Sequence, residues 1–313
     1  MRKILGTIIK ILVAAGIIWY LFSRVNWNLF FNSFKNVNIY LIIISMLALY
    51  LGVYFSILRW NVFLKNYNFK ISKLKLYSLY SIGTFFNNFL PTTIGGDVYK
   101  FVSLNKHFKE KRKEIISSLI LDRGSGFLIL FLINIALAPL FYRLITFDRR
   151  FLFLEISIFS GFIIILFFII NFQFLFRIEK LIKKEIPLFK KFNQLVVSLS
   201  SINNKKTLIH GAFYSILFFL VSSGIAWIQF YAFGVEINFF YILLVSSVTL
   251  ILGVLPISFN SIGITEGLNV FLFGCIGVPV EICLAVTIVG RVSLMVISSL
   301  GGIFYFFDRK IKY

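Results

Sequence analysis

The feature that most constrains the fold is a series of long apolar stretches. Each has about the 20 residues that a bilayer-spanning helix needs. Hydrophobic residues make up 59% of the 313-residue chain, and its mean hydropathy is +0.92. Soluble domains are only about 45–50% apolar. The sequence therefore predicts an all-α polytopic membrane protein, with residues 1–313 forming a single integral membrane domain. The long stretches are 4–22, 39–58, 115–142, 152–172, 207–233 and 280–306.

The chain is strongly basic, with a net charge of +20. In a soluble protein this excess would indicate a nucleic-acid partner, but no basic segment has a recognisable nucleic-acid motif. We interpret the charge as basic cytoplasmic loops that face anionic lipid. We expect no nucleic-acid partner.

Basic residues in the connecting segments predict the orientation of the chain. The 59–75 and 97–114 loops have five and six basic residues, so both are predicted to be cytoplasmic. The apolar stretch between them must then enter and leave the membrane on one side. Similar reasoning makes 240–279 enter and leave from the opposite face. We predict six full spans in the cell (plasma) membrane, both termini cytoplasmic, and two re-entrant elements at about 76–110 and 240–279. Eight plain spans are the alternative.

The two re-entrant elements resemble each other. The first reads "FLPTTIGGD" and reaches Arg123 26 residues after Asp97; the second reads "VLPISFNSIGITE" and reaches Arg291 25 residues after Glu266. If each acid begins a helix that turns back into the next span, each acid lies level with its arginine. The turns would be "FKEKRKE" and "GVP". Two such devices inserted from opposite faces predict an inverted repeat, as in many transporters.

Prolines and glycines explain why the helices are interrupted there. Pro91 and Pro256 are predicted to end the preceding helices, because proline lacks an N–H and clashes with the previous turn. Gly95, Gly96 and Gly263 are expected to allow backbone geometries that other residues resist. Such a backbone is tolerated at membrane depth only where it is buried in protein or lines a cavity.

The acids and the nearby cations indicate an anion site. Asp97 and Glu266 would each begin a helix, where the dipole favours negative charge and free N–H groups can receive anions. A lipid phosphate fits such a place, with Lys100, Arg123 and Arg291 as cationic partners. The alternative is that the two acid–arginine pairs only hold the hairpins together.

Four motifs occur in order along the chain: "NNFLPTTIGGDVYK", "LDRGSGF", "LPISFNSIGITEG" and "GRVSLMVISSLGG". Together they resemble the lysylphosphatidylglycerol synthase transmembrane-region family over essentially the whole chain. Lys100 stands where many relatives have arginine, which keeps the charge but loses the bidentate fork. By the family pattern, the signature positions are Asn88, Pro91, Gly96, Asp97, Asp122, Arg123, Pro256, Gly263, Glu266 and Arg291.

The resemblance implies lipid-linked work: flipping aminoacylated phospholipids, or handling lipid-linked sugar intermediates beside glycosyltransferases. We predict a lipid translocase whose partner is an anionic phospholipid or a polyprenyl-linked intermediate. The alternative is a non-transport accessory subunit of a lipid synthase or glycosyltransferase. Since the sequence ends at Tyr313, we do not expect it alone to act as a phosphatidylglycerol lysyltransferase.

Other chemistry finds little support in the residues. There is no P-loop pattern, and His107 and His210 lack metal-ligand spacing. Cys275 and Cys283 lie in apolar surroundings and are interpreted as buried small hydrophobes. Ser125 has no histidine on a plausible partner segment. We therefore expect no enzyme activity, no catalytic residue, no metal and no cofactor.

Overall fold

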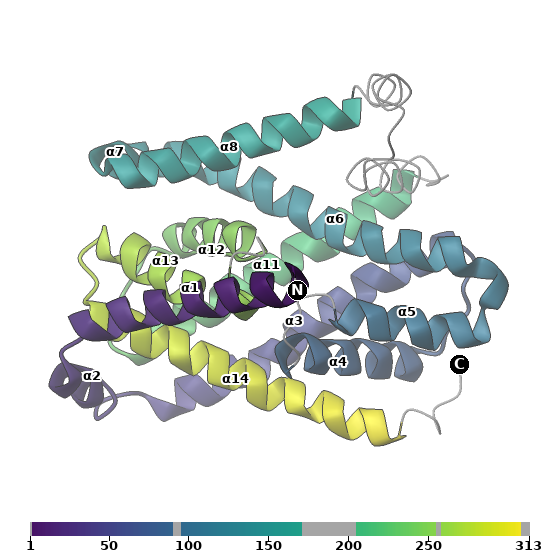
Figure 1. Cartoon of the computed structure of the whole chain (residues 1–313), viewed down its shortest axis with the longest axis horizontal. Coiled ribbons are helices and arrows are strands. Elements are labelled where there is room, and N and C mark those ends of the chain that lie inside the picture. Colours follow the sequence, from purple (N-terminus) through teal and green to yellow (C-terminus); the bar gives the residue numbers. More distant parts are fainter. Residues whose placement is uncertain (1, 90–94, 171–204, 255–257, 308–313) are drawn as a thin grey trace.

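The computed structural model describes residues 2–89, 95–170, 205–254 and 258–307. All regular structure within those residues is helical, which confirms the all-α prediction (Figure 1). Pro91 and Pro256, which we predicted to end helices, lie outside the described residues. The elements are α1 (Arg2–Arg24), α2 (Trp27–Ser33), α3 (Ile39–Asn66), α4 (Lys73–Phe89), α5 (Gly95–His107), η1 (Lys109–Lys111), α6 (Arg112–Leu137), η2 (Ala138–Phe141), α7 (Tyr142–Phe147), α8 (Arg149–Ile170), α11 (Lys205–Ala232), α12 (Phe239–Gly253), η3 (Phe259–Ser261), α13 (Ile264–Gly274) and α14 (Val280–Phe307).

The length and hydropathy of the helices identify a polytopic membrane protein. Among the described residues, four segments are long and apolar enough to cross a bilayer: Ile39–Asn66, Lys109–Leu144, Lys205–Ala232 and Val280–Phe307. Large apolar side chains stand exposed along such helices; Leu47 is an example. An outer surface of this kind suits contact with lipid rather than water. Shorter apolar helices cover Ile11–Arg24, Phe239–Gly253 and Ile264–Gly274.

Asparagines begin three of the helices. The Asn38 side chain accepts the backbone N–H groups of Tyr40 and Leu41 at the start of α3, at 3.1 and 3.3 Å. Asn26 accepts two backbone N–H groups in the same way at the start of α2, and Asn238 accepts that of Phe240 at the start of α12. Such caps satisfy backbone donors that have no partner inside the helix. The short helix α2 lies between the predicted apolar stretches 4–22 and 39–58, where no helix was predicted.

The centre of the bundle is the pair α3 and α11, which pack along each other. Gly211 of α11 leaves room for the ring of Phe63, which a Cβ there would overlap. Gln229 donates from its amide nitrogen Nε2 to Ser45 Oγ across the same interface at 3.3 Å. Both polar side chains are buried, so the interface combines close approach with a satisfied polar pair.

Helix α4 is held between α5 and α14 by glycines. A Cβ at Gly96 would overlap the carbonyl of Gly83, and a Cβ at Gly301 would overlap the carbonyl of Ser81. Our prediction that Gly96 supplies an unusual backbone geometry is wrong, because it lies in the first turn of α5 and has no positive φ. Its lack of a side chain is what the close approach requires. Gly263 does have a positive φ, +86°.

The turn between α5 and α6 and the turn between α13 and α14 both fall where the sequence predicted them. Helix α5 ends at His107 and the chain turns through η1 into α6. Helix α13 ends at Gly274, and the turn before α14 includes Gly277, whose φ is +83°. These turns bring the beginning of each short helix alongside the middle of the long helix that follows.

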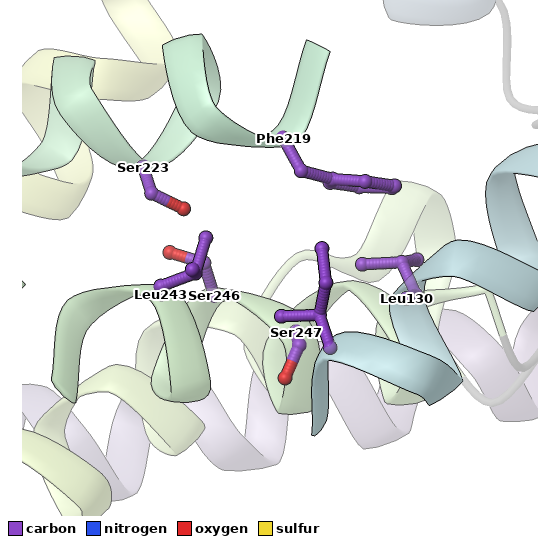
Figure 2. Close-up of a pocket in the computed structure, with 7 residues that line it drawn as sticks. Leu130, Phe219, Ser223, Leu243, Ser246 and Ser247 are labelled. Carbon is purple, nitrogen blue, oxygen red and sulfur yellow. The ribbon is translucent and has the colours of Figure 1, made fainter. Parts of the chain in front are cut away.

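A narrow pocket lies between α6, α11 and α12 (Figure 2). Its walls are apolar except for three serine hydroxyls. None of the residues predicted for the functional site lines it. The lining residues are Leu130, Ile133, Phe219, Ser223, Leu243, Ser246 and Ser247.

Candidate functional site

The first acid–arginine pair forms as predicted. Asp97 lies in the first turn of α5, and Arg123 of α6 donates from Nε to its Oδ2 at 2.9 Å. The Arg123 side chain is 48% exposed, whereas that of Asp97 is 15% exposed. Arg123 is therefore the open edge of the site, since about half of its side chain is exposed.

Lys100, one turn after Asp97, is almost wholly buried, at 3% exposure. Its Nζ lies 3.6 Å from Asp97 Oδ1, 3.6 Å from the centroid of the Tyr80 ring and 5.0 Å from that of Trp60. Aromatic faces attract a cation through their quadrupoles. The ammonium is thus held by one carboxylate and two rings. Trp60 Nε1 in turn donates to Ser118 Oγ at 3.3 Å.

A second buried ion pair was missed by the sequence reasoning. Arg59 was assigned to the 59–75 loop, which is wrong, because it lies inside α3 and is 7% exposed. Its Nε donates to Asp122 Oδ1 at 2.7 Å, and its Nη1 donates to Ser215 Oγ at 3.4 Å. Gly126 leaves space for the guanidinium, since a Cβ there would lie 2.9 Å from Nη1. An arginine inside the apolar run "SILRWNVFL" was the available signal.

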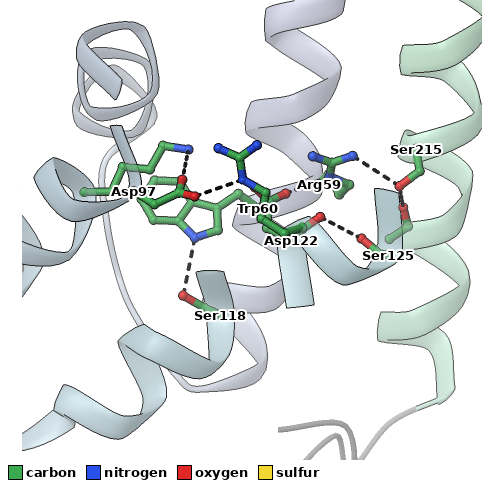
Figure 3. Close-up of polar contacts among 10 residues, drawn as sticks. Arg59, Trp60, Asp97, Ser118, Asp122, Ser125 and Ser215 are labelled. Atoms are coloured by element: carbon green, nitrogen blue, oxygen red, sulfur yellow. Dashed lines mark hydrogen bonds and ion pairs between the residues drawn. The ribbon is translucent and has the colours of Figure 1, made fainter. Parts of the chain in front are cut away.

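These residues form one polar cluster, which we define as Arg59, Asp97, Lys100, Asp122 and Arg123 (Figure 3). It has three cations and two carboxylates, and three minus two leaves one positive charge. An unbalanced charge inside an apolar bundle is costly and marks a functional site by default. A single negative charge bound at the open edge would balance it.

The second acid–arginine pair also forms as predicted, but it is self-contained. Arg291 donates from Nε to Glu266 Oε1 at 2.9 Å, and its Nη2 lies 2.7 Å from the same oxygen. Glu266 Oε2 accepts the backbone N–H of Gly263 at 2.6 Å, which caps the start of α13. Both carboxylate oxygens therefore have partners within the chain. The pair has no net charge.

The position that follows each acid by three residues differs between the hairpins. After Asp97 it is Lys100; after Glu266 it is Asn269. Asn269 donates from Nδ2 to Thr287 Oγ1 at 3.0 Å and accepts from Thr249 Oγ1 at 3.2 Å. This neutral chain of hydrogen bonds joins α12, α13 and α14. The first hairpin thus buries a cation where the second has a half-buried amide.

Three signature residues remain: Asn88, Pro91 and Pro256. Asn88 lies in the last turn of α4, but it is the neighbouring Asn87 that accepts the Gly96 N–H, at 2.8 Å. Pro91 and Pro256 lie outside the described residues. Within the described part of the chain, no group of three or more His, Cys, Asp or Glu side chains is placed to hold a metal ion.

Comparison with known proteins finds relatives that match nearly the whole chain. Residues 7–302 match the family model described as the lysylphosphatidylglycerol synthase TM region. The chain is 24% identical to a UPF0104 membrane protein of Pyrococcus horikoshii, over 99% of this chain and 98% of the relative. It is 22% identical to a UPF0104 membrane protein of Methanothermobacter thermautotrophicus, over 78% of each chain.

Proposed function

Because the chain belongs to the lysylphosphatidylglycerol synthase transmembrane-region family, we propose that it is a lipid translocase. It would move an anionic phospholipid or a polyprenyl-linked intermediate between the leaflets of the cell membrane. The observation that carries this proposal is the single excess positive charge of the polar cluster, with Arg123 at its open edge. A phosphodiester headgroup has one negative charge and matches it.

The headgroup would be received at Arg123. A phosphate that contacts this guanidinium competes with Asp97 for it, and Lys100 lies on the other oxygen of Asp97. Two unit charges 4 Å apart attract by about 4 kcal/mol at an effective dielectric constant of 20. That attraction is large enough to offset part of the headgroup's loss of hydration. The proposal assigns no catalytic step to the chain.

We also propose that α4–α5 and α12–α13 are re-entrant hairpins inserted from opposite faces, with both termini cytoplasmic. Their lengths support this: the four helices have 17, 13, 15 and 11 residues, fewer than the ~20 of a spanning helix. The packing supports an inverted repeat, since α4 packs on α14 as α12 packs on α6, around the central pair α3 and α11. A two-fold relation between α3–α6 and α11–α14 would produce this exchange of partners.

Thiol labelling tests the first hairpin. Cysteines would replace the exposed Lys70, before α4, and the exposed Lys106, near the end of α5, in a chain without Cys275 and Cys283. In sealed cells both should be shielded from an impermeant reagent. Labelling of one and not the other would favour eight plain spans.

A second candidate is a non-transport accessory subunit of a lipid synthase or glycosyltransferase. The observation that favours it concerns the Glu266–Arg291 pair: both carboxylate oxygens of Glu266 already have hydrogen-bond partners within the chain. In that role the ion pairs only hold the hairpins in place. Arg123 would then need no ligand.

Reconstituted liposomes separate the two candidates. The purified chain should speed the movement of fluorescent phosphatidylglycerol between leaflets, measured with an impermeant quencher, relative to protein-free vesicles. Arg123→Gln should abolish this gain, because it removes the excess charge of the cluster. Arg150→Gln is the matched control: it makes the same chemical change at an exposed arginine paired with Asp148. No gain with any lipid of a panel would favour the accessory role, and equal rates for wild type and Arg123→Gln would refute the site.

A further inference from the structure

Helix α8 has a narrow buried stripe that contains a carboxyl group. Among the side chains of residues 149–164 the buried ones are Phe151, Glu155, Ile158 and Phe162, at 0, 8, 3 and 8% exposure. Their spacing of four, three and four residues places them on one helix face. Phe162 stacks on Phe131 of α6, with ring centroids 5.2 Å apart. An acid therefore occupies the middle of an otherwise apolar seam.

The neighbours of Glu155 are neutral. Asn134 of α6 donates from Nδ2 to Glu155 Oε1 at 3.4 Å, and the same nitrogen donates to Ser247 Oγ of α12 at 3.3 Å. Ser247 donates in turn to the carbonyl of Leu244 at 2.7 Å. The two amide hydrogens of Asn134 thus join α8 and α12 to α6. Ser247 also lines the narrow pocket, together with Ser246 of α12 and Ser223 of α11 (Figure 2).

The helices that face this acid supply no charge close to it. Helix α6 has no charged residue after Arg123, which is 11 residues or about 16 Å along the axis from Asn134. Helix α12 has no charged residue at all. Its one ionisable group, Tyr241, donates its hydroxyl to the carbonyl of Leu272.

The remaining charges lie at the start of α8 and in α7. Arg149 and Arg150 precede Glu155 by six and five residues and are exposed. Arg150 donates from Nε and Nη2 to Asp148, and these hydrogen bonds hold the pKa of that carboxyl below its ordinary value. Helix α7 contributes Arg143, which is exposed. Among the described residues no cation lies within ion-pair distance of Glu155.

The contrast with the other intramembrane acids decides the state of this one. Asp97, Asp122 and Glu266 each have an arginine within 2.9 Å. From the described part of the chain, Glu155 receives one long hydrogen bond, from the Asn134 amide. A buried carboxylate without a cation is strongly disfavoured, and such a group takes up a proton instead.

We propose that Glu155 is a proton-binding site whose proton holds α8 against α6 and α12. When the proton leaves, a bare negative charge remains in the seam, and α8 must separate to let water reach it. Protonation of one side chain is then linked to the docking of one helix. This inference goes beyond lipid movement and does not depend on it, because it concerns the packing of α8 alone.

Infrared spectroscopy tests the proton directly. The purified chain in lipid nanodiscs should show a carboxylic-acid C=O band at neutral pH that is lost as the pH rises. Glu155→Gln should lack this band; the amide keeps the shape and stays neutral, so this variant should fold. Identical difference spectra for the wild type and Glu155→Gln would overturn the proposal.

Spin-label distances test the docking. Labels would be placed on cysteines at Leu132 of α6 and Phe159 of α8, which are 46 and 49% exposed and lie off the seam, in a chain without Cys275 and Cys283. With Glu155 present, the docked distance should lose population by up to about tenfold per pH unit above the titration midpoint. With Glu155→Gln it should stay constant. A distance independent of pH in the Glu155 protein would refute the link, even if the variant failed to fold.

Discussion

Replacing either partner of the Arg59–Asp122 pair should destabilise the bundle, and the loss should depend on which partner is replaced. The two side chains are 9 and 3% exposed and meet at 2.7 Å. At that distance and an effective dielectric constant of 20, their attraction is about 6 kcal/mol before desolvation is subtracted. Breaking a buried pair from one side costs roughly 3–5 kcal/mol, because it strands a charge.

The two single variants should differ, since only one stranded group can become neutral. In Asp122→Asn the guanidinium of Arg59 stays charged, because arginine does not lose its proton in proteins. The loss should be about 3–5 kcal/mol at any pH. In Arg59→Met the carboxyl of Asp122 can take up a proton. Because a carboxylic acid forms more readily at lower pH, the loss in this variant should shrink as the pH falls.

The double variant Arg59→Met with Asp122→Asn should recover most of the stability. Ser215, which Arg59 also contacts, keeps its hydrogen bond to the Gly211 carbonyl at 2.9 Å, so no hydroxyl is orphaned. Folded fraction in detergent would be measured during denaturation with sodium dodecyl sulfate at two pH values. Losses that simply add in the double variant, or an Arg59→Met loss that does not shrink at lower pH, would refute this account of the pair.

Two further predictions concern the hairpins. Gly301→Ala should lower the folded yield strongly, because its Cβ would overlap the carbonyl of Ser81; Gly124→Ala, where a Cβ meets open space, should have little effect, and equal yields by size-exclusion chromatography would contradict the close approach. Glu266→Gln and Arg291→Gln should each lower the folded yield, and the double variant should recover it, because each single change strands the other charge. If the double variant folds and still moves lipid in liposomes, the second pair only holds its hairpin.

Local sequence patterns predicted both acid–arginine pairs because the two partners of each pair lie on consecutive helices joined by one turn: α5 and α6, or α13 and α14. The distance along the chain from Asp97 to Arg123 is twice the length of one arm, so the turn alone determines which residues meet. The ends of α11 and α14 were predicted to within two residues for a similar reason: an apolar run and its flanking polar residues are adjacent in sequence. The end of α3 was not, because this helix continues to Asn66, past the predicted end at 58.

The Arg59–Asp122 pair could not be predicted in this way. Its partners are 63 residues apart and lie on helices that the hairpin turns do not relate. Counting basic residues near the end of a span assumes that they lie in water. That assumption failed for Arg59 and also for Lys75, which is 2% exposed. Glu155 was also missed, because its neutral surroundings are side chains of two other helices, α6 and α12.

The difference between Lys100 and Asn269 bears on how two similar hairpins could divide the work. Asp97 and Glu266 each pair with an arginine, so that pair alone would make the two hairpins electrically equivalent. The residue one turn later breaks the equivalence, with an ammonium between two rings in one hairpin and an amide between two threonines in the other. Only the first hairpin then has a charge that an anion can balance. In the translocase that we propose, the first hairpin receives the phosphate, and the second keeps the fold closed while the headgroup passes.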